Sequence, residues 1–439
     1  MVALDQTRTD ATNVLADNRD ERPARRDRLA IPALIAAQAI SSIGNSLTAI
    51  AIPWFVLATT GSAARTGMVA FAGTVPYIIA GLLGGAIVDR FGYKRSSVIS
   101  DLASGVTVAM IPTLHFLDLL QFWHLLVLAF LGALLDVPGF VARNAMVPRL
   151  SSRAGGPLER TNAGMQIALT GSSVLGPALA GILIATLGEA SVLYVDAASF
   201  ALSALIIGTL IVYPHIARVS EQTGLAAALS DARDGVRFFL SGPFLGKVIF
   251  ISLLANFVFA PLFSVLFPPY VKELFGNPQA LGFLGAAFGA GSLVGTIAYG
   301  AFGPRLRRYP IFLASMAVTT VGFWLLPWSS SLAISMLASL TIGLAAAPLN
   351  IFGMTCIQER VPEEMLGRVF GALLACAQLG APLAVLAAGF GIEAFGVRVP
   401  LAVAAAIFSL AAIFSFASPA MREIERSPSF QSVMNGVSE

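Results

Sequence analysis

The sequence predicts an all-α membrane protein with twelve transmembrane helices in two six-helix bundles. Of its 439 residues, 56% are hydrophobic and only 12% are charged, whereas a soluble domain carries about 25% charged residues. Apolar stretches of the length that spans a bilayer, roughly 20 residues, recur along the whole chain. The predicted spans are 30–59, 66–88, 96–114, 121–142, 162–187, 191–213, 246–270, 279–301, 310–327, 332–354, 367–390 and 397–418.

One long connection separates the sixth span from the seventh and divides the chain into halves. It is rich in charge and contains an amphipathic stretch, Leu225 to Leu240, of the kind that lies on a membrane surface. The first residues are polar and carry both signs, which favours a disordered cytoplasmic tail over a signal peptide. The predicted segments are an N-terminal tail (1–28), an N-terminal bundle (29–213), a cytoplasmic linker (214–245), a C-terminal bundle (246–418) and a cytoplasmic C-terminal tail (419–439).

The basic residues predict the orientation of the spans. If the N-terminus is cytoplasmic, 24 of the 27 Lys and Arg residues fall in cytoplasmic segments, and only Arg65, Lys272 and Arg398 fall outside. Such an excess on the cytoplasmic side is the general rule for membrane proteins. We therefore expect both termini in the cytoplasm and the spans in a bacterial inner membrane. The net charge of +3 is too small to indicate a nucleic-acid partner.

The connection between the second and third spans carries a specific motif, Gly85-Ala-Ile-Val-Asp89-Arg90-Phe-Gly92-Tyr93-Lys94-Arg95. It resembles the signature cytoplasmic loop of the major facilitator superfamily, in which Gly and three residues precede Asp-Arg, one residue, Gly and basic residues. One departure is Tyr93, which stands where a basic residue is usual. A degenerate copy of the same motif, in which Pro304 replaces the Asp, follows the eighth span. Such a repeat is expected for a transporter built from two related halves.

The resemblance implies a conformational gate at this loop. A carboxylate at a helix end can meet the positive N-terminus of a neighbouring helix, and the resemblance makes span eleven the neighbour of Asp89. That contact would lock the two halves in the outward-facing state. Arg143 is expected to belong to the same gate, paired with either Asp89 or Asp101. The expected gate residues are Gly85, Asp89, Arg90, Gly92, Lys94, Arg95 and Arg143.

The fifth span contains a second motif, built on Gly171, Gly176, Pro177 and Gly181. It resembles the Gly-Pro motif of drug:proton antiporters in the same superfamily, which favours export over import. Proline frees a carbonyl and bends a helix, and glycines allow a partner helix to come close. The alternative is a packing kink without any meaning for the direction of transport.

A third segment, Gln358-Glu-Arg-Val-Pro-Glu-Glu-Met-Leu-Gly-Arg-Val369, is similar to the branch that includes macrolide-efflux and enterobactin-exporter proteins. The resemblance covers roughly residues 30–418. It implies a secondary active transporter that exports small amphipathic molecules by alternating access and proton antiport. Its partners would be a small-molecule substrate, the proton and the lipid bilayer, with the monomer as the working unit. Uptake or lipid transport on the same scaffold is the alternative.

The sequence favours a transporter over an enzyme, because no catalytic groups converge in one or two loops. Gly242-Pro-Phe-Leu-Gly246-Lys247-Val248 is one residue too short for a phosphate-binding loop and lacks the Ser or Thr after the Lys. We therefore expect no direct use of ATP. We also expect no cofactor and no metal site, since the three histidines lack metal-ligand spacing.

Ionisable residues inside spans are the first candidates for function. Asp101, Asp136 and Asp196 lie in the third, fourth and sixth spans. Asp136 lies deepest and is the first candidate for proton coupling, with Asp101 second. An ion pair or a cap near Pro138 is the alternative for Asp136, and Asp196 is expected to be structural. No span of the second half carries an acidic residue near its midpoint, so coupling is expected in the first half.

Six neutral polar residues within spans are candidates to line a substrate cavity. Each one could instead serve as a hydrogen bond between helices. The candidates are Gln38, Asn45, Gln166, Asn256, Asn350 and Gln378.

Overall fold

The computed structural model describes residues 25–155, 158–213, 243–360, 380–419 and 421–422. Within these ranges the secondary structure is helical throughout, without a strand. The first half contains α2 (Arg25–Thr60), α3 (Ala63–Phe91), α4 (Tyr93–Phe116), α5 (Phe122–Arg153), α6 (Leu158–Leu187) and α7 (Glu189–Leu210). The second half contains α9 (Pro243–Pro261), η1 (Leu262–Leu266), α10 (Phe267–Leu274), α11 (Pro278–Phe302), η2 (Gly303–Arg305), α12 (Arg308–Trp328), α13 (Leu332–Arg360), a helix at Gly380–Phe395 and α15 (Arg398–Ala417).

The helices confirm the predicted class of fold. Ten helices are long and apolar enough to cross a membrane within the part of the chain that the structure describes, and Gly380–Phe395 is a shorter apolar helix. With α3, which is 29 residues long, these account for the twelve predicted spans. The tails and the linker with its amphipathic stretch lie outside the described residues, and so does the first part of the eleventh span.

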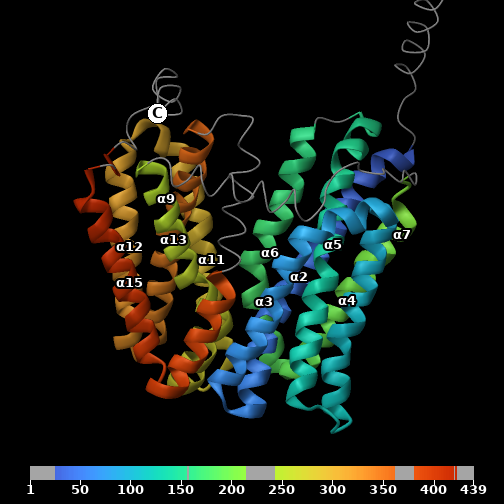
Figure 1. The fold of residues 1–439 in the computed structure, drawn as a ribbon. Helices are drawn as coiled ribbons and strands as arrows, with labels where there is room; N and C mark the ends of the chain where they lie inside the picture. The colour runs from blue at the N-terminus through green and yellow to red at the C-terminus, as the bar shows by residue number, and fades with distance from the viewer. Residues whose placement is uncertain (1–24, 156–157, 214–242, 361–379, 420, 423–439) are drawn as a thin grey trace, which may run out of the picture.

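Two bundles stand side by side (Figure 1). In the first, α2 packs on α6 and α7, α4 packs on α5 and α7, and α3 packs on α5. In the second, α13 packs on α11 and α12, and α15 packs on α12. The two bundles meet through α6 and α11, and through contacts of α2 and α3 with η1. Each bundle is thus formed by six spans that follow one another in the sequence, as expected for a chain built from two repeated six-helix units.

The seventh span differs from the others in its backbone. It continues to Leu274 rather than 270, and it passes through the π-helical turn η1, where the Phe267 N–H donates to the Leu262 carbonyl. Pro268 and Pro269 have no N–H group, so the carbonyls one turn earlier lose their α-helical donors. The backbone widens locally at η1, and such a π-helical adjustment can re-satisfy backbone groups that proline frees within a membrane helix.

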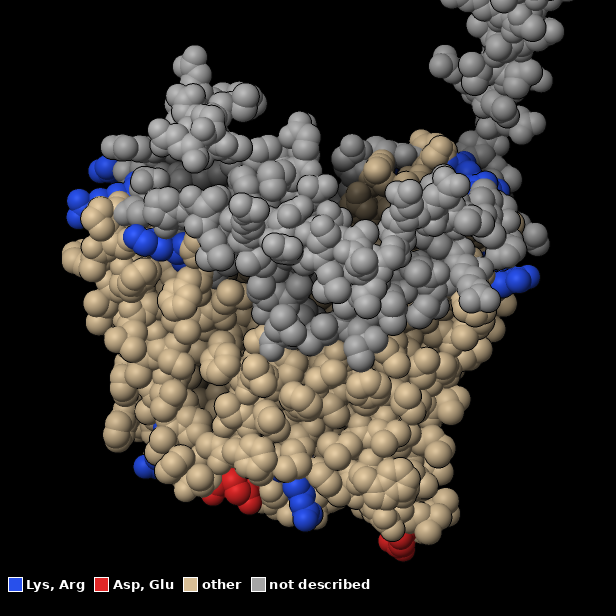
Figure 2. All heavy atoms as spheres, in the orientation of Figure 1, with Lys and Arg blue, Asp and Glu red and all other residues tan. Residues whose placement is uncertain are grey.

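The two ends of the molecule carry different charges (Figure 2). One end holds the α2–α3, α4–α5 and α6–α7 turns, and we call it the outer end because the basic residues predict that it faces outside. Its Arg65, Lys272 and Arg398 stand among Asp118, Glu189, Glu273 and Glu393. We call the opposite end the inner end; among the residues whose side chains the structure describes, it carries Lys94, Arg95, Arg149, Arg153, Arg160, Lys247, Arg305, Arg307, Arg308 and Arg422.

Candidate functional site

A buried ion pair joins α4 to α5 in the first half. Arg143 Nη1 lies 2.7 Å from Asp101 Oδ1, and the two side chains are 1% and 0% exposed. The other oxygen of Asp101 accepts a hydrogen bond from Ser203 of α7 at 2.7 Å. Arg143 also donates through Nε to Gln38 Oε1 of α2 at 2.8 Å and through Nη2 to Ser41 Oγ at 3.4 Å. The ion pair of Arg143 and Asp101 thus ties together four helices of the bundle, α2, α4, α5 and α7.

Hydrogen bonds and close helix packing around the ion pair explain how both charges can be buried. Gln38 Nε2 donates to Ser42 Oγ at 2.8 Å, so the amide that receives Arg143 is itself fixed. Gly139 lies one turn before Arg143, and a Cβ there would come within 2.9 Å of the Ser100 side chain. A buried ion pair is stable only when further hydrogen bonds satisfy its remaining groups. Of the two partners expected for Arg143, the structure brings Asp101 to it.

Asp136 lies two turns before Arg143 on α5 but makes a different contact. Its Oδ2 accepts a hydrogen bond from Asn45 Nδ2 of α2 at 3.1 Å. Its Oδ1 is buried and has no hydrogen-bond partner among the described residues. A buried carboxylate oxygen without a donor disfavours the charged form of the group. The ion pair or cap that was the alternative for Asp136 is not seen within the described part of the chain.

Asp196 lies in a third polar contact, between α7 and α2. Thr48 donates to its Oδ2 at 2.5 Å and Ser199 to its Oδ1 at 3.1 Å. Both oxygens are therefore satisfied, and the side chain is fully buried. Gly44 permits this approach, because a Cβ there would come within 2.1 Å of Asp196 Oδ1. This geometry agrees with the structural role predicted for Asp196.

The contacts reveal a polar stripe on α2 that the sequence interpretation named only in part. Its members recur every three or four residues, which places them on one helical face. Gln38 and Asn45 were singled out as cavity residues, whereas their neighbours were missed. The helical spacing was the signal that could have found the rest. The stripe consists of Gln38, Ser41, Ser42, Asn45 and Thr48.

The candidate cavity residues do not share one environment. Gln38 is 1% exposed and belongs to the Arg143 network, so in this conformation it does not face a cavity. Asn45 is half-buried beside Asp136. Gln166, Asn256 and Asn350 are exposed, and Gln166 donates to Thr170 at 3.3 Å. Gln378 lies outside the described residues.

The structure describes the side chains of only some of the expected gate residues. Gly92 has φ of 83° and separates α3 from α4, which is the tight turn expected there. Lys94 donates to the Gly208 carbonyl of α7 at 2.9 Å, and Arg95 is exposed. The backbone of α3 includes Gly85, Asp89 and Arg90, but their side chains lie outside what the structure describes, as does the start of span eleven. The contact expected for Asp89 therefore stays a prediction.

The Gly-Pro motif of α6 lies at the contact between the two halves. A Cβ at Gly181 would come within 2.8 Å of the Gly282 Cα of α11, and one at Gly285 would come within 2.4 Å of Pro177. Gly176 faces Ser46 of α2 instead, and Gly171 has nothing within 4 Å. The motif thus lets α6 and α11 cross almost backbone to backbone. The approaches of Gly181 to Gly282 and of Gly285 to Pro177 lie toward the outer ends of α6 and α11.

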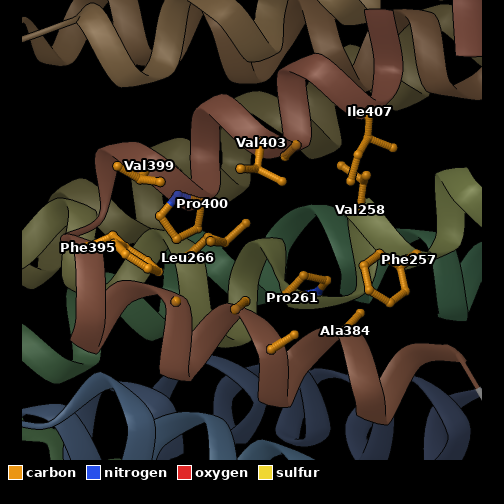
Figure 3. A pocket seen from close by; sticks show the side chains of 14 residues that line it. Phe257, Val258, Pro261, Leu266, Ala384, Phe395, Val399, Pro400, Val403 and Ile407 are labelled. Atoms are coloured by element: carbon orange, nitrogen blue, oxygen red, sulfur yellow. The ribbon is translucent and has the colours of Figure 1, made fainter. Parts of the chain in front are cut away.

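A separate cavity of about 260 Å³ lies within the second half (Figure 3). It is enclosed by α9, η1, the helix Gly380–Phe395 and α15, and every lining residue is apolar. Phe395, Val399 and Val403 at its rim are 71%, 44% and 51% exposed, so the rim reaches the flank of the bundle. None of the residues expected to form a site lines this cavity.

Comparison with known proteins identifies the family to which the chain belongs. The sequence model of the Major Facilitator Superfamily matches residues 34–278 and 248–432, which together span nearly the whole chain. The chain belongs to the Major Facilitator Superfamily. The resemblance drawn from Gly85–Arg95 is thereby confirmed, and the protein is a membrane transporter of this family and not an enzyme.

Two relatives lie close to the predicted branch. The chain is 30% identical over 396 residues to the multidrug efflux pump Tap of Mycolicibacterium fortuitum, covering 89% of this chain and 96% of the pump. It is 24% identical over 371 residues to macrolide efflux protein A of Streptococcus pyogenes, covering 83% and 89%.

Solved structures of other transporters share the fold. The nucleoside transporter NupG superposes with a TM-score of 0.73 at 14% identity, covering 89% of this chain and 98% of NupG. A bacterial homologue of the human lysosomal transporter Spinster, inward-facing and unoccupied, gives 0.70 at 16% identity, covering 92% and 100%. A D-xylose–proton symporter gives 0.68 at 15% identity, covering 88% and 97%. At these identities the similarity shows the fold alone.

Proposed function

We propose that this superfamily member exports small amphipathic, drug-like molecules by alternating access, driven by proton antiport. The names of its relatives support the substrate class, since one is a multidrug efflux pump and another a macrolide efflux protein. The Gly-Pro motif at Pro177 and Gly181 supports export. The working unit is the monomer, because one chain supplies both halves of the fold.

We further propose that the protein lies in the inner membrane of a bacterium with both termini in the cytoplasm. The charges of the described residues support this orientation. Ten Lys and Arg residues with described side chains stand at the inner end, against Arg65, Lys272 and Arg398 at the outer end. Cytoplasmic segments of membrane proteins carry this excess of basic residues.

Asp136 is the proposed proton carrier, and its unpaired Oδ1 is the observation on which the assignment rests. Both oxygens of Asp101 are occupied, one by Arg143 and the other by the Ser203 hydroxyl. Asp136 has one donor, Asn45, and a buried oxygen that can take a proton. Asp101 has no unoccupied carboxylate oxygen, so it ranks second.

The arrangement of the halves supports alternating access. The contacts of Gly181 with Gly282 and of Gly67 with Gly389 lie toward the outer end. In this conformation the outer end is therefore closed. The gate motif Gly85–Arg95 lies at the inner end of α3, where it would close the opposite side after the halves rock.

The test is a transport assay in cells that lack their own pumps. Accumulation of a panel of macrolides and fluorescent dyes is measured with and without a protonophore, for the wild-type protein and for Asp136→Asn. We expect the wild-type protein to lower accumulation and the protonophore to cancel the effect. Asp136→Asn should abolish gradient-driven export while the protein still inserts in the membrane.

The matched control is Asp118→Asn, at a residue in the outer α4–α5 turn with φ of 57°, a conformation that Asn tolerates well. It removes the same charge outside the polar network and should leave export unchanged. Export by Asp136→Asn at the wild-type rate would contradict the coupling role. Higher accumulation with the wild-type protein would show uptake instead of export.

A further inference from the structure

Two charged side chains of the second half contact one hairpin of the first half at the outer end. Glu393 Oε2, on the helix Gly380–Phe395, accepts hydrogen bonds from Ser62 Oγ at 3.1 Å and from the Ala64 N–H at 3.2 Å. Lys272 Nζ, on α10, donates to the Leu57 carbonyl at 2.8 Å. The hairpin is the turn between α2, which ends at Thr60, and α3, which begins at Ala63.

The signs of the two charges match the two helix ends that they contact. Ala64 lies in the first turn of α3, where N–H groups have no partner within the helix and the dipole is positive. Leu57 lies in the last turn of α2, where the dipole is negative. Its carbonyl accepts the Gly61 N–H at 3.0 Å, and Lys272 is a second donor to the same oxygen. A carboxylate at the first and an ammonium at the second are both attractive. Because each contact involves an ion, each hydrogen bond is stronger than a neutral one.

We propose that Glu393 and Lys272 form an outer clasp on the α2–α3 turn, which stabilises the outer-closed conformation and must open before substrate can leave. The proposal rests on the alternating access of the proposed function. The clasp joins the two halves directly, so opening the outer end separates both charges from their helix ends. Its strength therefore adds to the preference for the outer-closed conformation that the close helix contacts also support.

The clasp lies at the other end of the helix pair that the gate motif uses. The family resemblance pairs Asp89, at the inner end of α3, with span eleven. Glu393 lies at the outer end of span eleven and pairs with the beginning of α3. Between the two ends the helices nearly touch, since a Cβ at Gly67 would come within 3.0 Å of the Gly389 Cα. One helix pair thus carries a carboxylate on α3 for the inner side and a carboxylate on its partner for the outer side.

Distances between spin labels on the full-length protein in lipid nanodiscs test the clasp. In a Cys356→Ser, Cys376→Ser background, one pair of labels replaces Leu119 and Ser330 in exposed outer turns of the two halves. A second pair replaces Ser152 and Leu306 at the inner end; all four positions are exposed. The measurement needs neither substrate nor a proton gradient, so its outcome is separate from that of the transport assay.

We expect Glu393→Gln combined with Lys272→Met to lower the ratio of outer-closed to outer-open molecules about tenfold. The outer distance should lengthen and the inner distance should shorten together. Glu393→Gln alone keeps an acceptor oxygen and should give a smaller shift in the same direction, which covers the case in which the double variant folds poorly. A contact that merely stabilised the fold would lower the melting temperature without moving the distances.

The matched control is Glu273→Gln, which removes a charge next to Lys272 on the same short helix, at an exposed residue. It should leave both distance distributions as in the wild-type protein. Unchanged distributions in Glu393→Gln and in the double variant would overturn the proposal. Equal shifts in the control and in the clasp variants would also overturn it, because the effect would then come from net surface charge.

Discussion

The two halves of the molecule repeat one architecture but fill it with different chemistry. In the first half, Asp101, Arg143, Asp136 and Asp196 are joined to a polar stripe on α2. At the heart of the second half, Phe259, Phe323 and Phe408 pack with ring centroids 5.3–5.7 Å apart. Among the spans that the structure describes there, none carries an acidic residue away from its ends.

A second contrast concerns how tightly equivalent helices pack. In the first half, α2 and α7 lie close enough that Gly44 can accept no side chain against Asp196. In the second half, the corresponding space between α9 and α15 contains the apolar cavity of about 260 Å³. The comparison shows that the two halves differ in chemistry: the first half carries the buried charges on which the proposed proton coupling depends, and the described spans of the second half are apolar away from their ends.

The largest expected effect comes from removing Arg143. Arg143→Met should destabilise the folded protein by about 3–5 kcal/mol, because it leaves the Asp101 carboxylate buried without its cation. Adding Asp101→Asn should recover much of that loss, since the uncompensated charge is then gone. The measurement is thermal unfolding of the purified variants in detergent.

The comparison between Arg143→Met and the double variant with Asp101→Asn is the informative part of this experiment. A double variant no more stable than Arg143→Met would show that the buried charge is not the cause of the loss. A small loss in the single variant would mean that water or another cation reaches Asp101.

The next effect compares packing in the two halves. Ala142 on α5 is 0% exposed, so Ala142→Leu should overpack the first half and cost about 1–3 kcal/mol. Ala384 lines the cavity of the second half, so Ala384→Leu should be tolerated or should raise the stability by filling empty space. Melting temperatures of the two variants measure the difference, and equal losses would refute the contrast in packing.

The smallest effect concerns two threonines, the half-buried Thr48 and the fully buried Thr319. Thr48→Val removes a donor to Asp196 and should cost about 0.6 kcal/mol, and at most about 1.7, which is the range of such bonds between membrane helices. Thr319 of α12 is 0% exposed and its hydroxyl has no partner among the described residues. Thr319→Val should therefore be neutral or stabilising. Unfolding measurements in which Thr319→Val costs more than Thr48→Val would contradict the comparison.

Hydropathy and basic residues were enough to predict the fold. The spans are long apolar stretches with local signals, so their number and order follow from the sequence. Their ends were less accurate. The fourth predicted span stops at 142, whereas α5 continues to Arg153, because its inner end leaves the apolar zone without leaving the helix. The extension of the seventh span through η1 depends on how Pro268 and Pro269 are accommodated, which hydropathy does not measure.

The candidate site could be predicted only in part. An isolated acidic residue in a span is a clear signal, so Asp101 and Asp136 were singled out, whereas Arg143 lies one residue beyond the predicted fourth span and was named through the gate. Their partners were not found, because Ser203 lies 102 positions from Asp101 and contacts it only through packing. Glu393 was missed for the same reason, since its contacts on the α2–α3 turn lie 331 and 329 positions away. Its place at the end of a span gives it no local signal.

The most direct test of the central claim is proton release on substrate binding, measured with a pH-sensitive dye on the purified full-length protein in detergent. The substrate is a compound that the accumulation assay identifies. If coupling lies at Asp136, the wild-type protein releases protons when substrate is added, whereas Asp136→Asn binds the substrate and releases none. Equal proton release by the two proteins would contradict the account and place the coupling group elsewhere.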